Sequence, residues 1–185
     1  DVLNRAGLAT LLFDLLTPAE ALDRANVFDI DLLARRLLAG TRWIAAQPET
    51  GQLEVGYFGA STGAAAALWA AAESDRPIDA VVSRGGRPDL AGSRLASVTA
   101  PTLLIVGGED RQVLELNSAA AEQLRCVHEV VVVPGAGHLF DRGGGGAGVD
   151  QLGAETEVDA ARGPGEAAVR ADVGELDRDL IGRSR

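Results

Sequence analysis

The sequence contains no lysine: all 17 basic residues are arginine, and 27 acidic residues bring the net charge to −10. Nothing in it therefore forms the basic stripe that attracts nucleic acids or anionic membrane surfaces. Nor does any run approach the roughly 20 apolar residues of a membrane span. We accordingly expect a cytoplasmic protein that binds neither nucleic acid nor membrane.

Cysteine and histidine are equally scarce, with Cys126 alone and two histidines. One cysteine excludes an internal disulfide and a cysteine-rich zinc cluster, and no ligand cluster suggests a metal. The glycine-containing stretch "GASTGAAAAL" (59–68) is neither a dinucleotide fingerprint nor a phosphate loop ending in a lysine. We therefore expect no metal and no cofactor.

What the sequence does contain is a series of short apolar runs, each followed by polar or glycine-rich residues. Five of them predict strands: "LATLLF" (8–13), "LEVGYFGAS" (53–61), "DAVVSRGG" (79–86), "APTLLIVGGED" (100–110) and "HEVVVVPGAGH" (128–138). Helical patterns separate them, at 29–47, 62–73 and 113–124, whereas 14–29 has the polar composition of a loop. This alternation predicts an α/β fold with one parallel sheet covered on both faces, a three-layer sandwich.

The composition changes after residue 141. Residues 142–185 hold ten of the 23 glycines and no aromatic residue. Such a segment has little apolar surface to bury, and we predict a largely disordered tail. The predicted organisation is thus an α/β domain over 1–141 followed by a glycine-rich tail over 142–185.

Serine 61 stands between Gly59 and Gly63 at a predicted strand-to-helix junction. One interpretation is a helix N-cap, whose hydroxyl accepts from the first helical turn. The other is the G-x-S-x-G nucleophile elbow, in which a tight turn lifts the serine hydroxyl above the sheet. A serine nucleophile needs a histidine base, and the base needs a carboxylate to orient it.

Two later strand ends supply these groups. His138 lies in the loop "PGAGHLF", whereas His128 precedes a strand, where a structural role is expected. Asp110 closes "LLIVGGED", with Glu109 beside it as the second choice of acid. Functional groups of parallel sheets collect at the carboxyl ends of the strands. We therefore predict a catalytic triad of Ser61, Asp110 and His138.

Residues 8–140 resemble the C-terminal two-thirds of an α/β-hydrolase of the dienelactone-hydrolase-like branch, on "GYFGASTGAAAAL", "APTLLIVGGED" and "VPGAGHLF". The resemblance implies nucleophile Ser61, acid Asp110 and base His138. Because characteristic dienelactone hydrolases carry cysteine at the elbow, a serine here favours an esterase-like member. The resemblance also implies an oxyanion hole with one donor at the Thr62 N–H and a second from a strand and loop that we expect upstream of residue 1.

These features predict a serine hydrolase that acts on an ester-like small-molecule substrate. Arg84 and Arg87, in "SRGGRPDL", are candidate ligands for a substrate carboxylate, although such arginines commonly only solvate a loop. Missing upstream strands would leave the run at 8–13 as an unpaired edge and weaken catalysis. The alternative function is therefore a catalytically incomplete hydrolase-like domain that binds or regulates.

Overall fold

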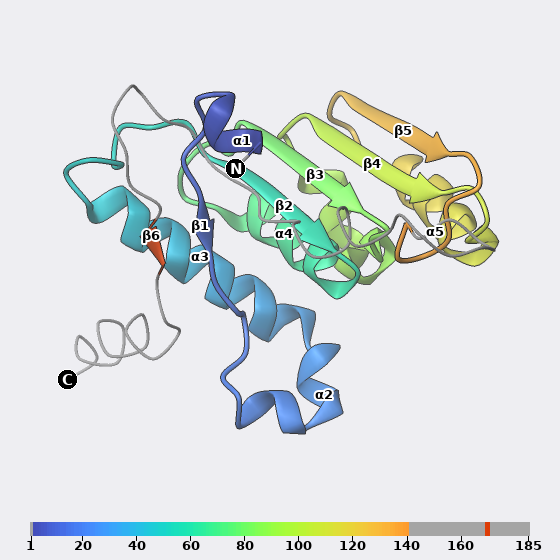
Figure 1. Cartoon of the computed structure of the whole chain (residues 1–185), viewed down its shortest axis with the longest axis horizontal. Coiled ribbons are helices and arrows are strands. Elements are labelled where there is room, and N and C mark those ends of the chain that lie inside the picture. The colour runs from blue at the N-terminus through green and yellow to red at the C-terminus, as the bar shows by residue number, and fades with distance from the viewer. Residues whose placement is uncertain (1, 141–168, 171–185) are drawn as a thin grey trace. The chain divides into compact units, whose positions relative to one another are not determined.

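A computed structural model describes residues 2–140 and 169–170 of the chain (Figure 1). The described residues fall into two compact units, one with residues 2–55 and 169–170 and the other with residues 56–140. The predicted tail over 142–185 lies outside the described residues, apart from Val169–Arg170. No helix in the described part of the chain is both long and apolar enough to cross a membrane.

The second unit is built on four parallel strands. They lie in the order β2 (Gly56–Ala60), β3 (Ala80–Arg84), β4 (Thr102–Gly107) and β5 (His128–Val133). The segments that connect successive strands form α4 (Thr62–Glu73), the 3₁₀ segment η2 (Pro88–Ser97) and α5 (Arg111–Ala121). In register, Ala60 pairs with Arg84 and Arg84 with Ile105. The loops that follow these strands therefore begin at the same end of the sheet, where the carboxyl ends of the strands lie.

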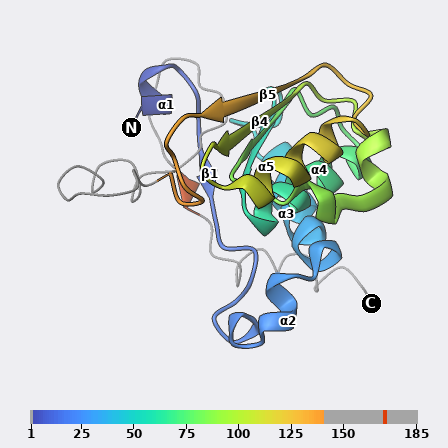
Figure 2. The same cartoon turned by 90° about the vertical axis from the view of Figure 1, so that its right-hand side faces the viewer.

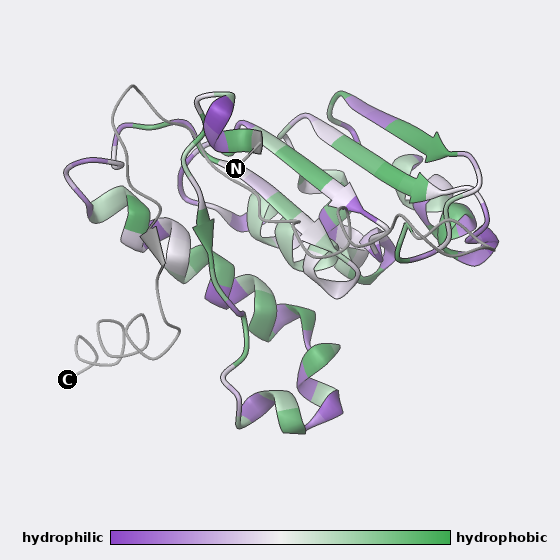
Figure 3. Ribbon diagram, viewed as in Figure 1, coloured by the Kyte–Doolittle hydropathy of each residue, from purple (hydrophilic) through white to green (hydrophobic). Residues whose placement is uncertain are grey.

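Helices α4 and α5 lie along the same side of this sheet (Figure 2). Figure 3 shows apolar residues along most of β4 and at the end of β5. Every second residue of the inner strands is fully buried, including Val81, Leu104 and Val106. The alanine-rich α4 is buried at Ala64 to Leu68, so its small side chains allow a close approach to the strands. The predicted parallel α/β sheet is confirmed over these four strands.

The first unit contains α1 (Val2–Arg5), β1 (Leu11–Leu12), η1 (Glu20–Leu22), α2 (Arg24–Val27), α3 (Ile30–Ala46) and β6 (Val169–Arg170). The sequence predicted α3 to within a residue at each end. Its N-cap is Asp29, whose carboxylate accepts from the Leu32 N–H at 3.0 Å. Ile30 and Leu33 on its apolar face are buried.

The prediction that residues 8–13 add a fifth strand to the sheet is wrong. Within this run only Leu11–Leu12 forms a strand, and it pairs in parallel with Val169–Arg170 in a separate two-stranded sheet. The run at 8–13 was expected to be an unpaired sheet edge, but its strand residues have a backbone partner. The strand ends at Leu12. The ring of the next residue, Phe13, comes within 2.7 Å of the position that a Cβ on Gly40 would take, so this side chain packs against α3 within the same unit.

The predicted loop over 14–29 contains two short helical segments. Glu20 and Thr17 form a capping box: the Glu20 carboxylate accepts from the Thr17 N–H and hydroxyl at 2.8 and 2.9 Å. Asp23 caps α2 by accepting from the Ala25 N–H. Local side-chain caps therefore order a segment whose composition indicated only a loop.

Candidate active site

Ser61 occupies a strained turn between β2 and α4. Its backbone has φ 50° and ψ −124°, a conformation that non-glycine residues rarely adopt and that costs about 1–3 kcal/mol. The residue is exposed, and its hydroxyl caps no N–H group of α4. Of the two interpretations of this serine, the N-cap therefore does not describe its side chain. Strain of this kind persists only where surrounding structure holds it.

The small residues around Ser61 make this turn sterically feasible. A Cβ on Gly59 would overlap the carbonyl group of Gly63 and the nitrogen of Ala64. The strand that enters the turn and the helix that leaves it thus approach at backbone distance. Any side chain at position 59 would force them apart.

Two backbone hydrogen bonds hold the carbonyl oxygen of Ser61. The Ala64 N–H donates to it from within the turn at 3.2 Å, and the Arg87 N–H donates from the loop after β3 at 2.9 Å. Thr62, predicted to supply an oxyanion donor, is the first residue of α4. First-turn N–H groups of a helix have no intrahelical acceptor, which is the condition that an oxyanion donor needs.

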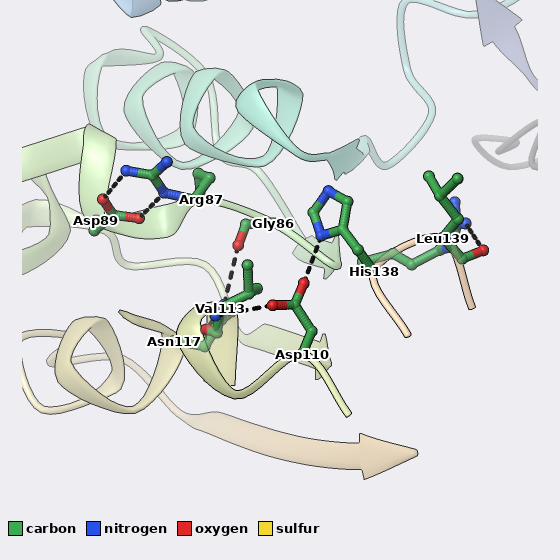
Figure 4. Close-up of polar contacts among 9 residues, drawn as sticks. Gly86, Arg87, Asp89, Asp110, Val113, Asn117, His138 and Leu139 are labelled. Atoms are coloured by element: carbon green, nitrogen blue, oxygen red, sulfur yellow. Dashed lines mark hydrogen bonds and ion pairs between the residues drawn. The ribbon is translucent and has the colours of Figure 1, made fainter. Parts of the chain in front are cut away.

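His138 and Asp110 meet beyond the ends of β5 and β4. The His138 Nδ1 lies 2.7 Å from Asp110 Oδ2 (Figure 4). The imidazole is 44% exposed and the carboxylate 17%. The other oxygen of Asp110 accepts from the Val113 N–H at 3.3 Å and so caps α5. Glu109, the second choice of acid, is exposed, and the structure gives its carboxylate no contact with His138.

Ser61 and His138 flank the segment that follows β3. On one side, the Arg87 N–H donates to the Ser61 carbonyl. On the other, Gly85 lies against the backbone of His138, since a Cβ on Gly85 would be 3.0 Å from the His138 carbonyl oxygen. Between the described atoms of Ser61 and His138 there is no hydrogen bond. Nucleophile–base contacts are commonly long without substrate and tighten when it binds. The roles of the three residues stay predictions.

The two candidate substrate arginines both contact protein groups. Arg84 donates to the Leu139 carbonyl at 3.2 Å, and its guanidinium lies 4.9 Å from the centre of the Phe140 ring. Arg87 forms a two-bond pair with Asp89 at 2.9 and 2.8 Å, which raises the pKa of Arg87 above its ordinary value. Substrate binding by either arginine stays a prediction.

One polar residue near the site gave no signal in the sequence. Asn117 lies in the middle of α5, in a stretch that indicated only a helix, and it is fully buried. Its amide donates to the carbonyl of Gly86 at 3.0 Å and to that of Val113 at 2.8 Å (Figure 4). The side chain of His128, which was expected to be structural, donates from Nδ1 to the Cys126 carbonyl at 2.9 Å. Within residues 2–140 no cluster of three metal-ligating side chains occurs.

A parallel sheet with a strained serine turn after one strand and a carboxylate–histidine pair after two later strands is the architecture of an α/β-hydrolase. The model of the dienelactone hydrolase family matches residues 19–161, and the chain belongs to this family. A dienelactone hydrolase from Anabaena variabilis is 54% identical, with a TM-score of 0.66 over 70% of this chain and 62% of that one.

Two mycobacterial relatives are also similar. A Mycobacterium tuberculosis protein named, provisionally, as a phosphoribosyl transferase is 59% identical over 165 residues, which cover 89% of this chain and 37% of the relative. An uncharacterized protein of the same species is 33% identical over 74% of this chain and 55% of its own length. The chain thus spans little more than a third of the first relative. Est1E from Butyrivibrio proteoclasticus shares the fold at 17% identity, with a TM-score of 0.52.

Proposed function

We propose that this chain forms the catalytic part of a serine hydrolase for ester-like small molecules. Ser61 is the nucleophile, His138 the general base and Asp110 the residue that orients the base. The observation that carries this proposal is the 2.7 Å contact between His138 and Asp110, because it leaves the other ring nitrogen available for a serine proton.

The proposed reaction has two halves. The Ser61 hydroxyl transfers its proton to His138 Nε2 while Oγ bonds to the ester carbonyl carbon, and the oxyanion that forms accepts from the Thr62 N–H. The tetrahedral intermediate then breaks its bond to the alcohol, which leaves with the proton from His138. Water, deprotonated by His138, attacks the acyl-enzyme and releases the carboxylic acid, which restores Ser61.

Asp110 keeps His138 in one tautomer. Its carboxylate accepts the Nδ1 proton, so Nε2 is the unprotonated nitrogen of the neutral ring, and it stabilises the imidazolium after proton transfer. Solvent exposure of the ring gives water access for the second half of the reaction.

The transferase name of the mycobacterial relative supports no second candidate here. That name describes a protein of which the chain covers 37%, whereas the family match covers most of the chain. The alternative that does remain is the non-catalytic hydrolase-like domain.

A fluorophosphonate probe separates the two. We expect the purified chain to be labelled at Ser61, located by mass spectrometry, and to hydrolyse p-nitrophenyl acetate. S61A should lose both reactions without loss of stability, because the hydroxyl is exposed and caps nothing. S93A, which removes another exposed serine, is the matched control and should retain both. A folded wild-type chain that takes no label would favour the binding or regulatory domain.

A further inference from the structure

One peptide unit lies between the serine turn and helix α5. The carbonyl of Gly86 and the N–H of Arg87 belong to the same planar group. The N–H donates to the Ser61 carbonyl at 2.9 Å, and the carbonyl accepts from the Asn117 amide at 3.0 Å. A continuous hydrogen-bonded path therefore runs from the Asn117 side chain to the backbone of Ser61.

This peptide has little freedom to move. Gly86 is buried, and a Cβ on it would overlap both Ser83 Oγ and Ala64 Cβ. The peptide is thus packed between the end of β3 and the first turn of α4. Its orientation decides whether the Arg87 N–H points at Ser61.

Packing alone does not explain an asparagine at position 117. It is fully buried, its amide nitrogen donates to the carbonyls of Gly86 and Val113, and its Oδ1 has no hydrogen-bond partner among the described atoms. A buried acceptor without a partner destabilises a fold, and an apolar residue of similar size would avoid that cost. What the amide provides in return is a donor aimed at the Gly86 carbonyl.

The strained turn needs such a support. Ser61 has φ 50°, and the Arg87 N–H is the donor to its carbonyl that comes from outside the turn. Hydrogen bonds in series polarise one another, so a donor on the Gly86 carbonyl strengthens the bond that its peptide N–H makes to Ser61.

We infer that Asn117 is a positioning residue for the nucleophile: through the Gly86–Arg87 peptide it holds the backbone of Ser61 in the strained conformation. The inference rests on the proposed function. Asn117 also lies on the helix that begins after Asp110. It therefore fixes the turn that carries the nucleophile relative to the helix whose N-cap orients the base.

The test is N117L, which removes the donor at similar volume. We expect the rate of fluorophosphonate labelling at Ser61 and kcat for p-nitrophenyl acetate to fall about 10- to 100-fold, because a small misplacement of a reacting group costs this much. KM should change little, since Asn117 does not reach the surface. Rates are taken per folded molecule, with the folded fraction measured by thermal melts followed by circular dichroism, so a loss of stability alone leaves them unchanged.

S83A is the matched control. Ser83 is fully buried, and its Oγ has no hydrogen-bond partner among the described atoms. The hydroxyl lies beside Gly86 but makes no hydrogen bond to the Gly86–Arg87 peptide. We expect its labelling rate to equal that of wild type. If N117L disrupts folding, N117V carries the same loss of donor in a smaller side chain and is measured in the same way.

Three results would contradict the positioning role of Asn117, and they can be told apart. Folded N117L or N117V that is labelled as fast as wild type overturns the positioning role while leaving the hydrolase intact. An equal loss in S83A also overturns it, because packing around Gly86 would then be the cause. A folded wild-type chain that takes no label overturns the proposed function, and the positioning role with it.

Discussion

The turn that carries Ser61 and the loop that carries His138 differ in how far side chains help to hold them. Backbone groups hold the first: the Ser61 carbonyl accepts from two main-chain N–H groups, and Gly59 lets the chain approach itself. The second is held by backbone and side chains together: the Glu109 and Phe140 N–H groups donate to carbonyls of the loop, Asp110 binds the ring, and Arg84 donates to the Leu139 carbonyl. Substitutions should therefore damage the serine turn chiefly by adding atoms, whereas the histidine loop should also be damaged by the removal of side-chain groups.

The largest effect is expected for D110N. Asparagine caps a helix about as well as aspartate, so α5 should persist and the melting temperature should change little. Because the amide no longer fixes the His138 tautomer, kcat for p-nitrophenyl acetate should fall about 10⁴-fold. D29N is the control, since Asp29 also caps a helix but contacts no histidine. Comparable turnover in D110N and D29N would remove Asp110 from the site.

The serine turn should fail when an atom is added. G59A places a Cβ on the backbone of Gly63 and Ala64 and should destabilise the protein by about 1–3 kcal/mol or more, together with a loss of labelling at Ser61. G63A is the control: a Cβ there meets nothing within 4 Å, and alanine favours a helix over glycine by up to about 1 kcal/mol. Urea unfolding of both variants checks this. A G59A as stable as G63A would show that the close approach is not required.

Loss of Arg84 should loosen the histidine loop. R84Q removes the bond to Leu139 and the contact with Phe140, and we expect kcat to fall about 10-fold with KM little changed, because misplacement of the base weakens proton transfer. R94Q is the matched control. Arg94 also lies over an aromatic ring, 3.5 Å from the centre of Trp69, and it forms an ion pair with Glu73. If R94Q slows turnover as much as R84Q, the effect is a general loss of packing. A rise in KM alone would instead favour Arg84 as a substrate ligand.

The smallest effect concerns another turn held by side chains, that of Thr17 and Glu20. Hydrogen bonds from Thr17, together with Arg36, lower the pKa of Glu20 below 4.5. Since the folded state has the lower pKa, the stabilisation is present above pH 4.5 and is lost as the pH falls through the folded pKa. E20Q should thus be less stable than wild type by about 0.5–1 kcal/mol at neutral pH, and the difference should shrink as the pH falls below 4.5.

Urea midpoints across this range measure the effect. E49Q serves as the control because Glu49 is exposed. A stability difference between E20Q and wild type that does not depend on pH would mean that the carboxylate charge has no part in the turn.

The sequence predicted best those elements whose signals are local. Helix α4 was predicted at its observed bounds because an alanine run ends at Glu73, and α3 because an apolar stripe begins after a capping aspartate. The run at 8–13 was misplaced because its pairing partner, Val169–Arg170, lies at the far end of the chain, in a segment whose composition indicated no strand.

The same distinction applies within the site. The chain order of Ser61, Asp110 and His138 predicted three loops at the carboxyl ends of the strands. The contact between Asp110 and His138 agrees with this placement. The contacts of Arg84 and Asn117 depend on how loops fold back over strand ends, which no spacing pattern records. An asparagine in mid-helix looks like an ordinary solvent-facing residue until its burial is known.

The peptide between Gly86 and Arg87 also offers a way to observe the serine turn without any substrate. Its N–H and C=O share one delocalised electron system, so the backbone ¹⁵N–¹H resonance of Arg87 responds to changes on either side of the plane. In an NMR spectrum, the chemical shift and solvent-exchange rate of this single amide would report whether the nucleophile's backbone is in place. Ligands, variants and longer forms of the chain can then be compared by one crosspeak.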